Sequence, residues 1–455
     1  GVTNRVLMYG QKLAAGSAAA GVAVQVSTAD EAKALFGRGS MLARMVELYR
    51  KNDPTSELWV VPLADDAGGT AQTKTITVTG PSTAAGSLVV RIAGQRLSVN
   101  VASGVSATTI AAAIVAAVTA APDLPVSAAN AAGVVTLTAK HKGEAGKDID
   151  VRINSEAGEL FPAGVATAVA SVTAGAGNPS TASVFTAIGD QPFTAFVCPY
   201  TDSTSLGALE AELALRWGPM KNLDGFGYSA AAGALNALAT LGAARNSQFV
   251  SIIGAKASPT PPWEWAAAYA AQVSASGAVD PARPFQTLTL QGVVPPAIAD
   301  RFTQPERDSL LRDGISTFTV QGSAVSIERA ITTYQTNAAG IDDVAWLDVN
   351  TPLTLATLRY TLRTRIASKY GRHKLVKDDV IPPGQPAIGP KGLRAEIIAW
   401  FQDCQARGWV EGLEQFKADL VVELDANDPS RINALIPPDL VNGLRVFAAV
   451  IQPRL

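Results

Sequence analysis

The stretch that organises this sequence runs from Asp313 to Lys377 and reads DGISTFTVQGSAVSIERAITTYQTNAAGIDDVAWLDVNTPLTLATLRYTLRTRIASKYGRHKLVK. It opens with two β-rich runs, at residues 315–320 and 324–327, and a linker then leads to one long helix. Seven Lys or Arg side chains fall within residues 359–377, and no Asp or Glu does. In a chain of net charge −2 this is a local positive field, and the sequence offers it no obvious internal partner.

The composition is that of an ordered globular protein. With 455 residues, 47% of them hydrophobic and 17% charged, the chain is long enough for about two to four domains with large cores. Its near-neutral charge gives nucleic-acid binding no global electrostatic support. We expect neither a membrane span nor a signal peptide, because the longest apolar runs are short. Cys198 and Cys404 lie in apolar surroundings and are expected to be reduced core residues.

The first 65 residues predict a β-α-α-β unit. Residues 5–9 and 22–26 have the composition of strands, a helix is expected to start at residues 27–31, and a second, amphipathic helix covers residues 41–49. Residues 58–63 (LWVVPL) form a continuous apolar run, which is typical of a strand buried on both faces. This order of elements predicts an α/β layer architecture, in which helices cover a sheet.

Residues 66–178 differ in composition and predict a β-rich domain inserted into the first one. They consist mostly of Ala, Thr, Val, Gly and Ser, and they begin and end in Gly-rich turns. We expect one helix at residues 107–120. The expected strands are residues 75–79, 88–93, 97–101, 134–139, 149–153 and 165–172.

Alternating strands and helices resume after residue 179, so residues 1–65 and 179–345 are interpreted as one discontinuous α/β core domain. Residues 346–455 are interpreted as a C-terminal α+β domain, which makes the fold class α/β and α+β multidomain. Within it, Phe416–Asp425 alternates like a strand. Leu444–Ile451 is predicted to be a terminal strand, apolar on both faces apart from Arg445, and such an edge must be covered by something.

A search for catalytic chemistry is negative. His141 and His373 have no Cys, His or Asp neighbours at metal-ligand spacing, and no serine-hydrolase or zinc-protease motif occurs. Residues 143–148 faintly resemble a phosphate loop, but we favour a β-turn between strands. The acid pairs at 342–343 and 378–379 are interpreted as solvated loop charges. We expect no catalytic residue, metal or cofactor; an α/β enzyme with an unrecognised site remains the alternative.

The basic helix has three possible roles. Residues 355, 358, 362 and 366 form an apolar stripe, so it could be an ordinary surface helix whose arginines cover the rim of the core with their alkyl stems. It could instead be a docking surface for an acidic partner. Nucleic-acid binding is the least favoured role, because only Tyr360 and Tyr370 are interleaved with the charges and the overall charge is unsuitable.

Taken together, these features resemble the tail sheath proteins of contractile-tailed bacteriophages, in the Mu-like branch. The opening residues 1–12 (GVTNRVLMYGQK) are similar to the first core strand of that family. Residues 313–335, 346–349 and 358–360 are similar to its C-terminal core, and so is the ending at residues 444–455. The inserted segment matches the variable, outward-facing insertions of the family. The resemblance covers nearly the whole chain but rests on diffuse patterns.

The resemblance implies a structural function. Sheath subunits stack as hexameric rings around an inner tail tube, and extended arms add strands to the sheets of neighbouring subunits. The sheath contracts by rigid rotation of its subunits and drives the tube through the host cell envelope, which requires no nucleotide site. The implied partners are other copies of the chain, the inner tube protein, and baseplate and tail terminator proteins. The implied location is the virion tail, assembled in the host bacterial cytoplasm, without membrane insertion or nucleic acid.

The resemblance also implies two sets of site residues. The domain with the basic helix would lie innermost, so the residues implied to dock on the tube are Arg359, Arg363, Arg365, Lys369, Arg372 and Lys374. Those implied to take part in strand exchange between subunits are Leu444, Val446, Phe447, Val450 and Ile451. Family members carry an N-terminal arm before the first core strand, and this sequence starts at that strand. We therefore expect this chain by itself to be monomeric or weakly associating.

Overall fold

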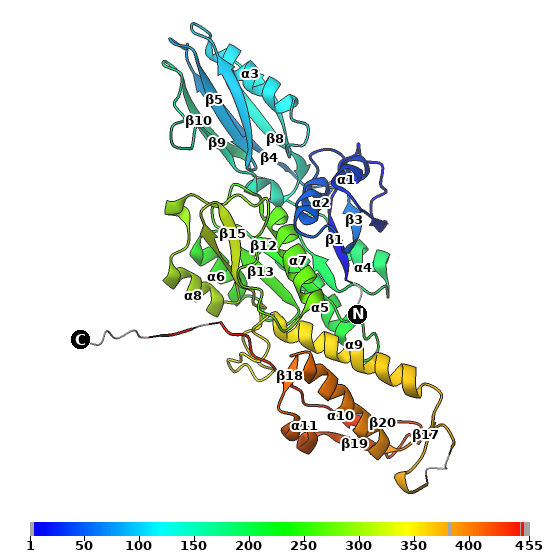
Figure 1. The fold of residues 1–455 in the computed structure, drawn as a ribbon. Helices are drawn as coiled ribbons and strands as arrows, with labels where there is room; N and C mark the ends of the chain where they lie inside the picture. The colour runs from blue at the N-terminus through cyan, green and yellow to red at the C-terminus, as the bar shows by residue number, and fades with distance from the viewer. Residues whose placement is uncertain (1–3, 381–383, 446, 450–455) are drawn as a thin grey trace, which may run out of the picture. The chain divides into compact units, whose positions relative to one another are not determined.

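The computed structural model describes residues 4–380, 384–445 and 447–449 (Figure 1). The chain forms two compact units. The first contains residues 3–275 and 285–347, and the second contains residues 276–284 and 348–455. The fold is mixed α/β and multidomain, as predicted.

A six-stranded sheet lies at the centre of the first unit, with the strand order β13-β12-β11-β1-β3-β2. All neighbours pair in parallel except β2, which runs antiparallel to β3. Nearly all residues of β1, β12 and β13 are buried, because helices cover both faces of the sheet. The strands are β1 (Arg5–Gln11), β2 (Val24–Gln25), β3 (Glu57–Leu63), β11 (Ala195–Val197), β12 (Phe226–Ala231) and β13 (Val250–Gly254).

The helices of this unit begin at the residue types that favour helix starts. Thr28, Ser40 and Asp202 cap α1, α2 and α5, each accepting a hydrogen bond from a backbone N–H of the first turn. The helices are α1 (Ala29–Phe36), α2 (Met41–Asn52), α4 (Ala182–Ile188), α5 (Ser203–Trp217), α6 (Leu235–Ala243), α7 (Pro262–Val279, which continues into the second unit) and α8 (Gln304–Arg312), with a short 3-10 turn, η2 (Ile298–Asp300).

The two β-rich runs that open the organising stretch form strands, as predicted, and these strands pair as an antiparallel hairpin. Its strands are β14 (Thr317–Gln321) and β15 (Ala324–Arg329), and Gly322 adopts a positive φ of 61° in the turn between them. A single bridge between Ile253 and Ser316 places the start of the hairpin beside β13.

The inserted segment, residues 66–178, forms sheets of its own. One has the strand order β10-β4-β8-β7 and the other β6-β5-β9, and α3 packs against β7 and β6 (Figure 1). The region predicted as a β-turn is a short 3-10 helix, η1. The elements are β4 (Ala71–Thr79), β5 (Gly86–Ile92), β6 (Gln95–Val101), α3 (Ala107–Thr119), β7 (Val126–Ala131), β8 (Val134–Lys142), η1 (Glu144–Asp148), β9 (Val151–Ile153) and β10 (Ala166–Thr173).

The second unit is built on two long helices, α9 and α10, which pack side by side (Figure 1). Its core includes Leu358, Trp400 and Phe401, with Leu355 and Leu362 of the predicted apolar stripe packed against it. The elements are α9 (Asn350–Tyr370), β16 (Lys374–Leu375), η3 (Asp378–Val380), β17 (Ala387–Ile388), α10 (Pro390–Ala406), β18 (Val410–Glu411), α11 (Leu413–Asp419), β19 (Val421–Leu424), β20 (Ile432–Leu435) and β21 (Asp439–Leu440).

Two strand predictions in the second unit are wrong. The strand predicted for Phe416–Asp425 is instead the end of α11 followed by β19. Leu413, Phe416 and Leu420 also fit the helical period, and the Phe416 ring stacks on Phe401 at a centroid distance of 3.8 Å, which favours the helix. In the predicted terminal strand, residues 444, 445 and 447–449 form no strand, and Val446, Val450 and Ile451 lie outside the described residues.

Candidate functional site

No catalytic constellation emerges from the described residues. Within residues 4–380, 384–445 and 447–449, no three His, Cys, Asp or Glu side chains group in a way that could hold a metal ion. Cys198 and Cys404 are free thiols in the core, as predicted, and burial raises their pKa values to about 12 and about 11. Both are therefore protonated and unreactive near neutral pH. None of the helices in the described part is both long and apolar enough to cross a membrane.

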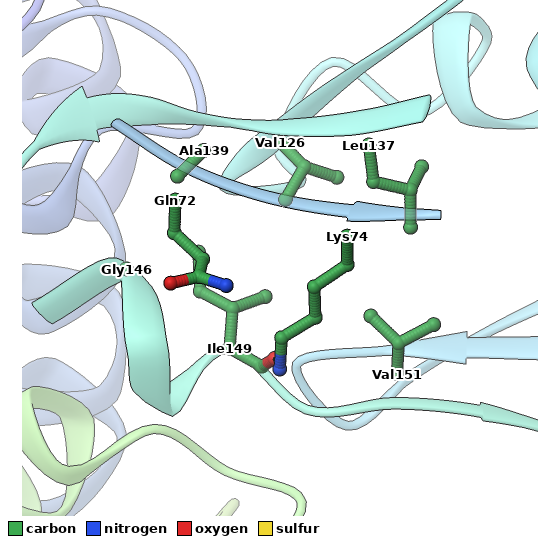
Figure 2. A pocket seen from close by; sticks show the side chains of 8 residues that line it. All are labelled: Gln72, Lys74, Val126, Leu137, Ala139, Gly146, Ile149 and Val151. Atoms are coloured by element: carbon green, nitrogen blue, oxygen red, sulfur yellow. The ribbon is translucent and has the colours of Figure 1, made fainter. Parts of the chain in front are cut away.

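One small cavity lies inside the inserted segment (Figure 2). Its volume of ≈ 10 Å³ has room for about one water molecule and for no substrate. The Lys74 ammonium, on its wall, donates a hydrogen bond to the carbonyl of Ile149 at 2.5 Å, and burial lowers the pKa of this lysine. Burial also raises the pKa of the neighbouring Asp148 to about 6. The cavity is an imperfectly filled core, lined mostly by apolar side chains.

The basic residues of α9 do have internal partners, contrary to the prediction. Arg365 forms ion pairs with Glu396 and with Asp403, the latter at 2.5 Å. Lys369 pairs with the same Glu396 at 2.6 Å. These acids lie on α10, far away in sequence, so no pattern local to α9 could reveal them. Arg359 and Arg363 also take part in interactions within the structure.

Glu396 is the centre of this charge cluster. Its side chain is 11% exposed, and Tyr370 donates a further hydrogen bond to it at 2.8 Å. Burial acts to raise the pKa of Glu396, but the hydrogen bonds from Lys369, Arg365 and Tyr370 outweigh burial and lower the pKa to about 2. Glu396 is therefore ionised at neutral pH and fastens α9 to α10. The positive charges of Arg365 and Lys369 are therefore paired within this contact between α9 and α10.

The other predicted docking residues are distributed differently. Arg359 and Arg363 are partly exposed on α9, while Arg372 and Lys374 are exposed after its end. The exposed His373 packs its ring edge against Tyr370 at a centroid distance of 5.1 Å. The exposed positive charge is thus concentrated around the end of α9. Tube docking by these residues stays a prediction.

A two-stranded hairpin, β19–β20, provides a feature that the sequence did not reveal. Val421 and Leu435 lie directly opposite each other in its ladder, and they are 45% and 64% exposed. Val422, which points to the opposite face, packs against the core of the second unit. No third strand pairs with either edge of the hairpin among the residues that the structure describes. The hairpin thus combines open backbone edges with an exposed apolar pair.

The segment after β21 exposes the apolar side chains predicted for strand exchange. Leu444 is 73% exposed and Phe447 is 84% exposed. Between them, Arg445 pairs with Asp348 at 3.1 Å and donates a hydrogen bond to Asn350 at 3.3 Å, which fixes the start of this segment. Leu444 and Phe447 are therefore accessible for contact with a partner.

Comparison with known proteins identifies the family. Residues 174–333 match the phage tail sheath protein central domain, and residues 342–454 match the phage tail sheath C-terminal domain. Over 451 residues, 99% of this chain and 92% of the relative, the sequence is 42% identical to the Mu-like prophage FluMu tail sheath protein of Haemophilus influenzae. The chain belongs to the phage tail sheath protein family. It is a tail sheath protein of the Mu-like type, which confirms the resemblance.

Solved structures of sheath proteins share the fold. The sheath tail protein of Desulfitobacterium hafniense superimposes with a TM-score of 0.52 over 97% of both chains, at 14% identity. That of Listeria innocua gives a TM-score of 0.53 at 14% identity, covering 97% of this chain and 92% of the other. The anti-feeding prophage baseplate contains a chain with a TM-score of 0.51 at 11% identity, covering 100% and 94%. Both matched family domains lie outside residues 66–173.

Proposed function

We propose that this tail sheath protein polymerises as stacked hexameric rings around an inner tail tube. Contraction occurs by rigid rotation of its subunits and drives the tube through the host cell envelope. The free energy for this step resides in contacts between subunits, so we assign the chain no catalytic role. Baseplate and tail terminator proteins contact the two ends of the polymer. Assembly takes place in the host cytoplasm. The observation that carries the proposal is the β19–β20 hairpin, with its open edges and exposed apolar pair.

Strand donation is the proposed bond between subunits. The segment from Leu444 to Ile451 of one subunit adds to an edge of the β19–β20 hairpin of a neighbour. A two-stranded hairpin is only marginally stable in water, and added strands satisfy its outward N–H and C=O groups. The same addition covers Val421 and Leu435 on the acceptor and removes Leu444 and Phe447 of the donor from water.

Replacing Leu444 and Phe447 together by Asp tests the donor segment. Both side chains are exposed in the single chain, so its melting temperature should change little, whereas assembly into sheath should be abolished. Electron microscopy of sheath assembly on tail tubes measures the effect. The matched control places the same change at exposed sites elsewhere, Val169→Asp with Val172→Asp in β10. Normal sheath formed by the Leu444/Phe447 variant would contradict strand donation.

The three-part domain layout is also a proposal. The second unit, interpreted as the C-terminal domain from residue 346, lies next to the tube and presents Arg359, Arg363, Arg372 and Lys374 to an acidic tube surface. The inserted segment forms a separate domain that faces outward. Two observations support this arrangement: the inserted segment has its own sheets, and both family matches lie outside residues 66–173.

Charge reversal tests the docking surface. Arg359→Glu with Arg363→Glu should weaken sheath binding to tubes by at least tenfold, because repulsion replaces attraction at the contact. Co-sedimentation with purified tubes at several salt concentrations measures this change. Arg312→Glu, at an exposed position on α8, is the matched control. Unchanged binding by the double variant would exclude this face of α9 as the tube contact.

A further inference from the structure

The inserted segment is joined to the α/β core by a buried polar cluster around His141, which stands at the end of β8. The His141 ring is buried, with 8% of the residue exposed. Its Nε2 accepts a hydrogen bond from the backbone N–H of Met41, the first residue of α2, at 3.1 Å. Its Nδ1 lies 2.9 Å from Oδ1 of Asp65. Because Nε2 is the acceptor, Nδ1 carries the proton and donates a hydrogen bond to Asp65.

Asp65 accepts two further hydrogen bonds. It accepts the backbone N–H of Lys142 at 3.0 Å and the side-chain amide of Gln11 at 2.8 Å. The same Gln11 amide donates to the carbonyl of Lys142 at 2.6 Å. Burial acts to raise the pKa of Asp65, but the hydrogen bonds outweigh it and keep the pKa below its ordinary value. We call Gln11, Met41, Asp65, His141 and Lys142 the junction cluster.

The junction cluster lies where α/β proteins ordinarily bind ligands. Gln11 ends β1 and Asp65 follows β3, so both lie at the carboxyl edge of the parallel sheet. The strand order reverses beside β1. The chain first places β3 on one side of β1, and the strand of this sheet that follows β3, β11, then lies on the other side. Such a reversal creates a crevice that holds ligands in many α/β folds. Here His141 and Lys142 of the chain itself bond to Asp65 and Gln11 at this edge, and Asn178 donates a hydrogen bond to Asp202 after β11 at 2.9 Å.

A second set of contacts between the α/β core and the inserted segment lies at the start of α2. The Arg44 guanidinium forms a buried ion pair with Glu264 of α7 at 2.5 Å. It also donates hydrogen bonds to two carbonyls of the inserted segment, those of Asp123 at 3.1 Å and Ala93 at 3.3 Å. Arg38 adds a two-pronged contact to the Asp123 carboxylate at 2.9 and 2.8 Å. Arg152 of the inserted segment also donates a hydrogen bond to the carbonyl of Ala257 at 2.9 Å, so the segment is held at several places besides its covalent links.

We propose that the inserted segment and the α/β core move as one rigid body, and that His141 is the positioning residue that fixes their mutual orientation. The covalent connection consists of two chain passages, bridged at Thr70 and Ala176, and two such passages alone would act as a hinge. His141 prevents hinge motion because it satisfies the first amide of α2 on one side and a carboxylate of the core on the other. The inference does not depend on the proposed tail function.

Hydrogen exchange tests the role of His141 directly. In His141→Phe the amide of Met41 loses its acceptor, and we expect exchange at Met41, Lys142 and residues 65–70 to accelerate at least tenfold, with β12 and β13 unchanged. His141→Asn should keep the donor to Asp65 but cannot reach Met41, so only Met41 should exchange faster. His373→Phe, at the exposed second histidine, is the control. Unchanged exchange at Met41 in both His141 variants, or equal acceleration across the whole first unit, would overturn the proposal.

A distance measurement tests rigidity itself. Spin labels at exposed Asn130 of the inserted segment and exposed Asp30 of the core can be placed selectively, because both native cysteines are buried. The intact protein should give one narrow distance distribution, and His141→Phe should broaden it. A broad distribution with His141 intact, or one left narrow by His141→Phe, would contradict the proposal.

Discussion

Glu396 shows how a single residue changes the interpretation of a charged segment. Seen along the sequence, the basic run of α9 has no acid near it, yet Arg365 and Lys369 both end on this carboxylate. The positive field that looks available to a partner is therefore smaller than the sequence indicates. Arg372 and Lys374 are basic residues that the structure exposes after the end of α9.

The stability of the second unit should depend on the ionisation of Glu396. Its folded pKa of about 2 lies below the ordinary glutamate value of about 4.3, so its stabilising contribution is complete above pH ~4.3 and is lost as the pH falls toward 2. Glu396→Gln should lower the free energy of unfolding by about 1–3 kcal/mol at pH 7, because Lys369 loses its acidic partner and Arg365 keeps only Asp403. Denaturant unfolding at several pH values, followed by tryptophan fluorescence, measures both effects.

The variant should also flatten the loss of stability between pH 4.3 and pH 2, since the titrating group is gone. Glu414→Gln is a suitable control, because this glutamate also pairs with a lysine but its side chain is 85% exposed. A variant at position 396 with the same stability and the same pH profile as the unaltered protein would show that the cluster contributes nothing.

At the scale of elements, the β19–β20 hairpin is the surface that most needs a partner. Val421→Asp with Leu435→Asp should lower the free energy of unfolding by no more than about 1 kcal/mol, since both side chains are partly in solvent and the main added cost is repulsion between the facing carboxylates. The same change should abolish assembly, because it buries two carboxylates under an incoming strand. Electron microscopy together with thermal unfolding separates the two effects. Ala434→Asp, on the same exposed strand but facing the other way, provides the control for acidic substitution. Assembly unaffected by the double change would contradict the acceptor role.

Elements with a clear period were predictable from the sequence, and those with two compatible periods were not. The apolar run of β3 and the stripe of α9 each fit a single pattern, and both elements form as expected. Residues 416–424 fit both a strand and a helix, and the stacking of Phe416 on Phe401 favours the helix for the first part. The buried strand β12 (FGYSAA) was missed, because Gly, Ser and Ala carry little strand propensity and only their position inside the sheet buries them.

The residues of the proposed subunit contacts and of the junction cluster were predictable only in part, because some of their partners lie far away in sequence. The exposed Leu444 and Phe447 are visible in the sequence as apolar residues in a terminal run, and the structure finds them in solvent. The Val421–Leu435 pair is not visible, because the strand register that opposes them follows from an unpredicted turn. The role of His141 is not visible in the sequence either, since its partners Met41 and Asp65 are distant along the chain.

At the scale of the whole molecule, the chain is a tail sheath protein in which most polar chemistry serves internal contacts. The sheet edge that would hold a ligand in many α/β proteins is hydrogen-bonded to the inserted segment, and the exposed apolar pair of the β19–β20 hairpin lies in the second unit. This division is consistent with the proposed strand exchange between neighbouring subunits. We therefore propose that contacts between copies of the chain determine assembly.

The most direct test of that claim is a cryo-electron microscopy structure of phage tails that carry this sheath protein. We expect each β19–β20 hairpin to be extended by at least one strand from a neighbouring subunit, with Val421 and Leu435 covered. A sheath in which the hairpin stays two-stranded and both side chains remain in solvent would contradict it.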